Sequence, residues 1–430
     1  MKKLVLVALN EFDPDFFRHA AEHSSLPHIG RMLETRHIST WTADEVEKQG
    51  LDPWVQWVSI HTGTDSSKHG IRHLGDVPGL SDPQLWEVLS ARGVSSGIWG
   101  AMNASRGRAE LCRFFLPDPW TFSEKAYPQE LNRLLALPRY YATHYLDTSA
   151  FEVVKALGKL AMFVLSKPTL LPLLFTTIPL ALRGIVKSGL KNHVLFSLFD
   201  LVSVTFFLHY KARYKPDFSL VFLNSVAHMQ HNIWCEEGTL DPQCLYALQV
   251  IDDVLGKLYA EGSELLVVNA LTQRNIANKK VAIVYRQIDP ETFVSAVGVP
   301  FSRVEQLMTN DAHVFFENAD QARKASELLG SATIQGVPIF DVEYDAANPL
   351  KVFYQLDYWA EVAPDAVIDF AGRSLRFYDY FDKLVDRTGE HIPRGDVYSS
   401  GPELPDNIPN HEIYDHIVSF YESRSACTHG

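Results

Sequence analysis

The stretch FSLVFLNSVAHMQHNIW, residues 218–234, decides how the rest of the sequence is interpreted. Its first six residues form an apolar run that predicts a buried strand. His228 and His231 follow the end of that run three residues apart and could supply metal ligands. Asn224 stands where a carboxylate would complete such a set. The stretch therefore raises the question of which kind of site keeps its histidines and lacks its carboxylate.

Apolar runs and helical patterns alternate on both sides of this stretch. Before it lie the runs LVLVAL at residues 4–9 and VSSGIWG at residues 94–100, with helical patterns between them. After it, residues 241–260 repeat leucine and isoleucine at helical spacing behind a predicted N-cap at Asp241, and ELLVV at residues 264–268 is a further strand. This alternation predicts an α/β fold with a mostly parallel sheet sandwiched by helices.

The composition is that of an ordinary globular protein with an acidic balance. Of the 430 residues 46% are hydrophobic, and 39 basic against 52 acidic side chains give a net charge of −13. A nucleic-acid backbone needs a basic face, so this charge argues against nucleic acid as a partner. The four cysteines show no CxxC spacing, and reduced thiols are expected. The start MKKLVLVALNEFD lacks a signal-type cleavage site, so we expect a cytoplasmic protein.

Residues 125–213 are rich in Leu, Phe and Pro and interrupt the alternating pattern. Two strongly apolar segments within residues 169–210 raise the question of contact with a membrane surface. The first carries two prolines and is too short to span a bilayer, and the second has Asp200 near its middle. We therefore favour a hydrophobic helical cap insertion, placed to line a pocket for a partly apolar substrate, over a membrane-dipping hairpin.

A small α/β subdomain is predicted after the second half of the core. Its pattern is a strand-like AHVFFEN, a helical ADQARKASELLG and a strand-like VPIFDVEY. The predicted parts are thus the first half of the core, the cap insertion, the second half of the core, the small subdomain and a C-terminal return to the core, at residues 1–124, 125–213, 214–304, 305–350 and 351–430.

Several segments resemble, in chain order, the alkaline phosphatase superfamily and in particular its type I phosphodiesterase and nucleotide pyrophosphatase branch. LPHIGRML resembles the family's LPNLxRL helix, and PWVQWVSIHTGTDSSKHGI resembles the segment that follows the nucleophile. NSVAHMQHNIW resembles the D-x-x-x-H metal motif, LLVVNALTQ lies where SDHG is expected, and GEHIPRG resembles the late H-x-x-x-G motif. The resemblance implies the fold predicted above.

The resemblance also implies two metal ions that clamp a phosphoryl group while a threonine or serine attacks it. Carrying the motifs over position by position gives the residues that would surround the ions. The matching positions are Asn224, His228 and His391 for one ion, and Asn10 or Glu11 with Asn269 and Ala270 for the other.

Asparagines in place of carboxylates argue against a binuclear centre. Two dications bring four positive charges into one cleft, and few carboxylates remain to balance them. We expect at most one divalent metal, held by His228, His391 and Glu11, and zinc, manganese or iron would each accept that donor set. Asn224 and Asn269 would then line the site and bind substrate. The competing hypothesis is that no metal binds.

The nucleophile of the family has no direct equivalent. Its position falls on Pro53, which cannot attack, and Asp52 comes just before it. Asp52 is a candidate catalytic carboxylate at a helix N-terminus, where free amides gather around an anion. The competing interpretation is that Asp52 only caps the helix and Pro53 occupies its first turn.

Three further polar side chains are expected near the cleft. His231 lies one turn beyond His228 if the segment is helical, so it is a candidate catalytic residue or a histidine packed beside Trp234. Gln56 and Gln273 are candidates to bind a substrate oxygen, although buried amides more commonly bridge groups of the core.

These patterns support three functional hypotheses. The favoured one is a diverged hydrolase or transferase that acts on a phosphate or sulfate ester of a small molecule. The second is a catalytically inactive binding or scaffold protein that keeps the fold. The third is an enzyme of other chemistry that uses the cleft histidines as acid and base.

Overall fold

The computed structural model describes residues 3–44, 51–144, 146, 148–189, 191–235, 239–278, 282–346 and 348–422. The chain divides into two compact units, each formed by segments that are distant in the sequence. The larger unit comprises Met1–Arg133, Ala161–Asn278 and Thr388–Gly430, and the smaller comprises Leu134–Leu160 and Lys279–Arg387.

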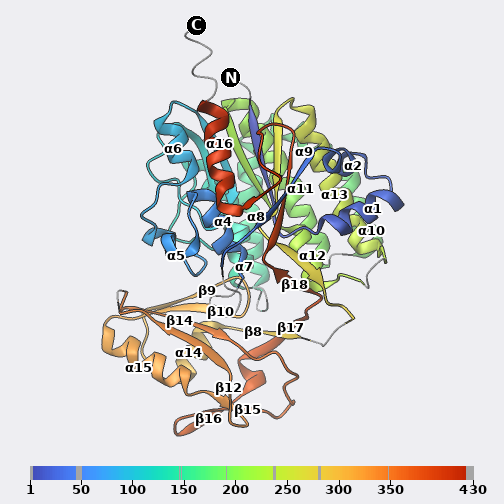
Figure 1. The fold of residues 1–430 in the computed structure, drawn as a ribbon. Coiled ribbons are helices and arrows are strands. Elements are labelled where there is room, and N and C mark those ends of the chain that lie inside the picture. Colours follow the sequence, from blue (N-terminus) through green and yellow to red (C-terminus); the bar gives the residue numbers. More distant parts are fainter. Residues whose placement is uncertain are drawn as a thin grey trace. The chain divides into compact units, whose positions relative to one another are not determined.

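The larger unit is built on an eight-stranded sheet (Figure 1). Strand β1 (Leu4–Leu9) lies at its centre and pairs in parallel with β5 (Phe218–Leu223) and β6 (Glu264–Val268). Only β19 runs antiparallel to its neighbours. The strand order is β20 (Asn407–Pro409), β2 (Arg36–Trp41), β19 (Arg394–Ser399), β6, β1, β5, β3 (Ser96–Ala101) and β4 (Cys112–Pro117). The predicted mostly parallel sheet is confirmed.

Helices flank this sheet in Figure 1, and this explains the continuous apolar runs of its strands. All six side chains of β1 are buried, as expected for a strand covered on both faces. The predicted helix over residues 241–260 begins where its cap indicated, because Asp241 accepts a hydrogen bond from the Gln243 N–H. The flanking helices are α1 (Pro14–His23), α2 (Pro27–Leu33), α4 (Pro53–Thr62), α5 (Ser66–His69), α6 (Leu85–Ala91), α12 (Ser225–Asn232), α13 (Pro242–Ala260) and α16 (Ile413–Glu422).

The region predicted as a hydrophobic cap consists of helices. They are α7 (Asn132–Thr143), α8 (Ala150–Leu165), α9 (Leu170–Phe175), α10 (Ile178–Ser188) and α11 (Asn192–Tyr214). Asp200, near the middle of α11, is buried and accepts hydrogen bonds from the backbone N–H groups of Asn224 and Ser225. The charge that argued against a membrane span thus caps the N-terminus of α12.

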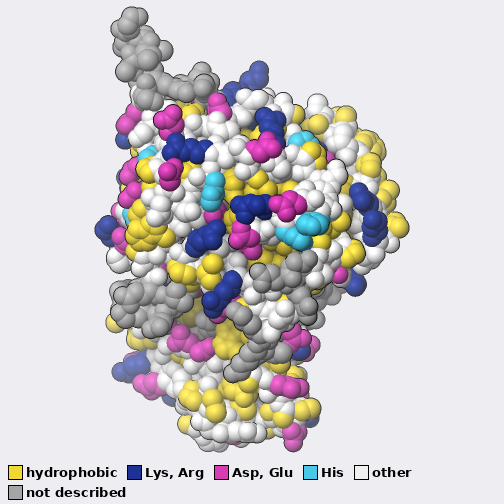
Figure 2. All heavy atoms as spheres, turned by 45° about the vertical axis from the view of Figure 1, so that its right-hand side comes forward, with side chains coloured by type: hydrophobic (Ala, Val, Ile, Leu, Met, Phe, Trp, Pro, Cys, Tyr) yellow, Lys and Arg dark blue, Asp and Glu magenta, His cyan; other side chains and the backbone are white. Residues whose placement is uncertain are grey.

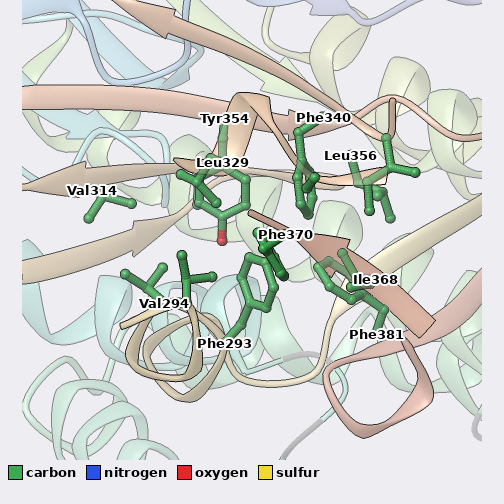
Figure 3. Packing of buried hydrophobic residues seen from close by; sticks show 14 of the residues in the cluster. Phe293, Val294, Val314, Leu329, Phe340, Tyr354, Leu356, Ile368, Phe370 and Phe381 are labelled. Carbon is green, nitrogen blue, oxygen red and sulfur yellow. The ribbon is translucent and has the colours of Figure 1, made fainter. Parts of the chain in front are cut away.

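The smaller unit has its own hydrophobic core, drawn in Figure 3. Phe293 of α14 (Pro290–Val297) packs there against Phe340 and Tyr354 from two strands of one sheet. That sheet has the order β13 (Phe340–Tyr344), β14 (Lys351–Leu356), β10 (Asp311–Phe315) and β9 (Arg303–Gln306), and α15 (Ala319–Gly330) connects β10 to the later strands. Because β14 pairs with both β10 and β13, the sheet continues beyond residue 350.

Charges of both signs are interspersed on the surface. On the face drawn in Figure 2, Lys and Arg side chains lie among Asp and Glu side chains. A nucleic-acid-binding surface instead gathers basic side chains along one face.

Candidate metal centre

Three parallel strands end side by side at one edge of the large sheet, and each is followed by a polar residue. Asn10 follows β1, Asn224 follows β5 and Asn269 follows β6. The backbone N–H of Asn10 donates to Leu223 O at 3.0 Å, and that of Glu11 donates to Asn269 O at 3.1 Å, so the three turns are held together. The carboxyl ends of parallel strands are the usual place for a site in an open α/β sheet.

Two of these turns contain a non-glycine residue in the left-handed backbone region. Glu11 has a φ of 58° after β1, and Ala270 has a φ of 65° after β6. Such conformations are uncommon for residues with a Cβ and concentrate at functional sites. The turn at Glu11 directs its side chain into the protein, where the residue is only 3% exposed.

The carboxylate of Glu11 meets two imidazoles. Its Oε2 lies 2.8 Å from Nε2 of His231 and 2.9 Å from Nε2 of His391, and the two Nε2 atoms lie 3.2 Å apart. These three residues form the Glu11 cluster, which is one of two groups among the described residues with metal-ligand composition. Because an ionised carboxylate only accepts hydrogen bonds, each imidazole donates to Oε2 when no other group binds there.

The histidines of the cluster come from two elements that the backbone ties together. His231 lies on the last turn of α12, and His391 lies on β18 (Gly389–Ile392), which pairs with β7 (Thr272–Asn275). Thr388 donates from its N–H to His231 O at 2.8 Å. The contact needs a glycine at position 389, because a Cβ there would lie 2.8 Å from a backbone oxygen of α12.

His231 therefore takes the place in the cluster that the sequence had assigned to His228. Asn224 is the N-cap of α12, and His228 lies one turn along, so its side chain remains beside Asn224. Its ring stacks on Phe196 of α11 at 3.8 Å. His231 lies almost one turn further along the helix and reaches β18. The structure thus brings His231, and not His228, beside Glu11 and His391.

A neutral hydrogen-bond network adjoins the cluster and fixes the orientation of each amide. Trp57 Nε1 donates to Asn10 Oδ1 at 2.8 Å, so the Asn10 amide nitrogen faces the other way. That nitrogen donates to Glu11 Oε1 at 2.7 Å and to Asn224 Oδ1 at 2.8 Å. The Asn224 amide nitrogen lies 3.3 Å from His228 Nε2, which must accept. We call this chain of side chains the asparagine network.

The pKa is lowered for a side chain in each of the two regions, and the two shifts leave opposite charge states. Burial raises the pKa of Glu11, but the adjacent imidazoles of His391 and His231 outweigh it and hold this pKa well below its usual range. Burial lowers the pKa of His228 to about 4, so this ring is neutral at pH 7. The carboxylate is charged, and the side chain at the end of the asparagine network is not.

A divalent metal fits the donor atoms of the Glu11 cluster. Donors around a tetrahedral zinc ion lie about 3.3 Å apart, and those of the cluster lie 2.8, 2.9 and 3.2 Å apart. Binding would need only small outward shifts of the side chains. Nδ1 of His231 lies 3.4 Å from Gly389 O, and Asn10 holds the second carboxylate oxygen. These are the outer contacts that orient metal ligands.

The side chain of Gln273, a predicted substrate ligand, hydrogen-bonds to the carboxylate of the cluster. Its Nε2 donates to Glu11 Oε2 at 2.5 Å. Its Oε1 is buried and has no hydrogen-bond partner within the described parts of the chain. A flipped amide would set this oxygen against the carboxylate, so the orientation is fixed by charge. Gln273 therefore positions Glu11 rather than facing a ligand.

The side chains of Asn269 and Gln56, which were predicted to bind substrate, hydrogen-bond to groups of the protein. Asn269 is fully buried, and its amide donates to Phe12 O at 2.9 Å and accepts from Asp396 N at 2.8 Å. Gln56 on α4 is also fully buried and bonds to Asp44 and Asn410. Both ends of each amide are already used by the fold.

Asp52 lies at the start of α4, but its side chain makes no capping hydrogen bond to that helix. It is the N-cap residue of α4, and its carbonyl accepts from the N–H groups of Val55 and Gln56. Within the described chain, the side chains that hydrogen-bond to the Glu11 carboxylate are those of Asn10, His231, Gln273 and His391. The predicted catalytic carboxylate is thus not part of the Glu11 cluster.

Sequence reasoning missed Gln230, which holds the turn behind Glu11. Its Nε2 donates to Glu11 O at 2.9 Å, and its Oε1 accepts from Asp13 N at 3.0 Å. No local motif could have indicated this role, because the partners are more than 200 residues apart in the sequence. The buried helix position one residue before His231 was the available signal.

The second group of metal-ligand composition is formed by Cys235, Asp241 and Cys244. Burial raises the pKa of both thiols, and both donate to Ile233 O, at 3.7 and 3.3 Å. Asp241 is already the cap of α13. In this group both thiols donate a hydrogen bond to the backbone, and the Asp241 carboxylate accepts one from Gln243 N.

Comparisons with known proteins concern the fold. No family model and no curated protein matches the chain. Among solved structures, phosphonoacetate hydrolase from Sinorhizobium meliloti 1021 in complex with phosphonoformate matches with 11% identity and a TM-score of 0.47, covering 97% of this chain and 96% of that one. Human ectonucleotide pyrophosphatase/phosphodiesterase 5 matches with 10% identity and a TM-score of 0.45, covering 98% and 95%.

The alkaline phosphatase from the Antarctic bacterium TAB5 also matches, with 9% identity and a TM-score of 0.38, covering 98% of each chain. Each of these matches extends over nearly the whole of both chains.

Proposed function

We propose that the protein is a hydrolase or transferase of a phosphate or sulfate ester that binds one divalent metal ion through Glu11, His231 and His391. The observation that carries the proposal is the convergence of these three donors from three separate elements onto one point at the carboxyl edge of the sheet. Zinc, manganese and iron all suit two histidines and a carboxylate.

The charges of the Glu11 cluster and the asparagine network favour the binding of one metal ion and of an anionic substrate. The cluster contributes one carboxylate, and the adjoining asparagine network contributes none. A dication balanced by one carboxylate leaves a net positive site, which favours the oxygens of a phosphate or sulfate group. A second dication would meet the neutral amides of Asn10 and Asn224 where carboxylates would be needed to bind it.

A bound metal ion and the side chains of the protein would contribute different parts of the chemistry. A bound dication would supply Lewis-acid polarisation of an ester oxygen. Asn10 and Gln273 hold the Glu11 carboxylate in place from opposite oxygens, so its geometry does not depend on the substrate. His228, neutral and next to Asn224, lies at the edge of this region as a candidate proton acceptor.

The test is metal analysis of full-length protein purified without chelator and without a metal-binding tag. We expect one equivalent of metal per chain, lost in Glu11→Gln and in His391→Ala. Activity on aryl phosphate monoesters, diesters and sulfates should follow metal content. Protein that takes up no metal under any loading condition would exclude the proposal.

The hydrogen bonds within the Glu11 cluster are also compatible with a competing function. In the Glu11 cluster each imidazole already donates to the carboxylate, an arrangement that a metal-free acid–base enzyme or a binding protein would also use. Metal-free protein with activity unaffected by chelators would favour the acid–base enzyme. Metal-free protein that binds anions without turnover would favour the binding protein.

A further inference from the structure

The outer side of α9 and α10 exposes large hydrophobic side chains. Phe175 is 65% exposed and Val186 is 82% exposed. Among the described residues of the larger unit, comparably exposed large hydrophobic side chains outside this area are Trp41, Tyr127, Leu195 and Phe199. We call the exposed set the cap face, and its members are Met162, Leu165, Leu171, Leu173, Phe175, Ile178, Leu182 and Val186.

The orientation of α10 is the reverse of that of an ordinary surface helix. Its buried residue is Gly184, which packs so closely on Tyr246 of α13 that an added Cβ would lie 2.2 Å from the tyrosine ring. Ile178, Leu182 and Val186, spaced four apart, form a stripe on exposed positions. A helix in contact with water alone would direct that stripe inward, so the outward stripe calls for an apolar partner.

The segment of the chain that carries this stripe is positively charged. Residues 161–199 contain Lys167, Arg183, Lys187 and Lys191 and no Asp or Glu, in a chain with 39 basic and 52 acidic residues. Arg183 and Lys187 are exposed and directly follow Leu182 and Val186 in the sequence. Basic side chains beside an apolar stripe complement an anionic lipid surface.

The segment suits the surface of a bilayer better than its interior. Leu170–Ser188 is 19 residues long with a mean hydropathy of 1.5 and is only 17% buried, but it includes Arg183 and Lys187. The other long apolar helix, α11, is 50% buried and supplies Asp200 to the N-terminus of α12. It therefore belongs to the protein core.

We infer that the cap face docks the protein on the surface of an anionic lipid bilayer, with α10 lying in the interface. The sequence favoured helices packed on one another, but the structure leaves residues 170–188 mostly exposed. The apolar stripe would enter the headgroup boundary, while Arg183 and Lys187 extend to the lipid phosphates. This inference is independent of the metal and of the ester substrate.

The experiment is vesicle flotation of the full-length protein with phosphatidylcholine vesicles, with and without phosphatidylglycerol. We expect binding to the anionic vesicles that weakens as salt is raised. A triple variant, Phe175→Gln, Leu182→Gln and Val186→Thr, should lower the partition coefficient by at least ~30-fold. A double variant, Arg183→Gln and Lys187→Gln, should lower it about five-fold for each charge removed.

The matched control removes the same number of exposed hydrophobic side chains from the smaller unit, with Val337→Thr, Leu350→Gln and Val367→Thr. It should bind vesicles like the wild type. The inference is overturned by wild-type protein that ignores anionic vesicles, or by a cap-face variant that binds as well as the control. It is equally overturned if the cap face instead joins two copies, seen as a dimer in solution that the triple variant makes monomeric.

Discussion

The Glu11 cluster and the asparagine network adjoin at the ends of β1 and β5, yet they handle charge in opposite ways. The cluster places one carboxylate between two imidazoles. The network commits each polar atom of Asn10 to a neutral neighbour or to Glu11 itself. An asparagine is required at position 10, because Trp57 needs an acceptor while Glu11 and Asn224 need donors. Because carboxylates are missing from the network, the charged side chain of Glu11 lies beside the neutral side chains of the asparagine network.

The two histidines of α12 give the sharpest test of this difference. Replacing His231 with alanine removes a donor of the cluster, so metal affinity should fall by more than ~100-fold. Replacing His228 removes a ring that stacks on Phe196 and should leave metal affinity within about three-fold, with a stability loss of about 1 kcal/mol. Isothermal titration with zinc and manganese measures both.

The matched pair separates the two regions because both substitutions are on the same helix. Equal loss of metal affinity in the two variants would show that the network and the cluster form one site. Loss only in the His228 variant would restore the ligand assignment made from the sequence.

Placing a carboxylate in the asparagine network should destabilise the folded protein. Asn10→Asp keeps the acceptor for Trp57 but places a charged oxygen about where the amide nitrogen now lies, 2.7 Å from Glu11 Oε1. We expect a loss of roughly 3 kcal/mol in unfolding free energy, measured by denaturant titration of the metal-free protein. Asn318→Asp, at the N-cap of α15 where either residue is accepted, is the control.

Metal analysis of Asn10→Asp then tests the number of ions. If several neutral asparagines together limit the site to one ion, the Asn10→Asp charge alone should not raise the number of metal ions bound per chain. Asn224 and Asn269 remain neutral in this variant. Uptake of two ions by this single variant would contradict that account.

The close approach of β18 to α12 can be tested through glycine. A Cβ at position 389 would lie 2.0 Å from Gln273 Oε1 and 2.8 Å from Gln230 O. Gly389→Ala should therefore destabilise the protein by about 2 kcal/mol and weaken metal binding, because Gln273 and His391 move. Gly30→Ala in α2, where the added Cβ meets nothing within 4 Å, should be neutral or stabilising. Thermal unfolding compares the two.

The sequence specified the fold better than the site, for a physical reason. Strand β1 and helix α13 follow from local apolar spacing and a cap, and both are where they were predicted. Glu11 and His391 were predicted as metal ligands from a strand end and a family motif, and their side chains lie together in the structure. The choice between His228 and His231 depends on where β18 crosses α12, which is a contact between residues about 160 positions apart. The spacing of residues within one segment of the sequence does not indicate such a long-range contact.

The roles of the side-chain amides could not be predicted from local sequence either. Gln56, Asn269 and Gln273 are chemically suited to bind a substrate, and the sequence cannot tell a ligand-facing amide from one that holds backbone. In the structure all three are buried and bonded to protein groups.

The last prediction concerns the pH dependence of stability and Asp200, which links the cap to the asparagine network. Burial raises the pKa of Asp200 to about 6, above the value of about 3.9 for an unfolded chain. A raised pKa means that the unfolded chain releases its proton first, so stability falls as pH rises from about 4 to about 6 and is level above that. The difference corresponds to at most about 3 kcal/mol. Asp200→Asn lacks this dependence, so its melting temperature relative to wild type should improve over that interval, with exposed Asp320→Asn as control. A constant difference from pH 4 to pH 7 would mean that the bonds from Asn224 and Ser225 keep Asp200 ionised at no cost.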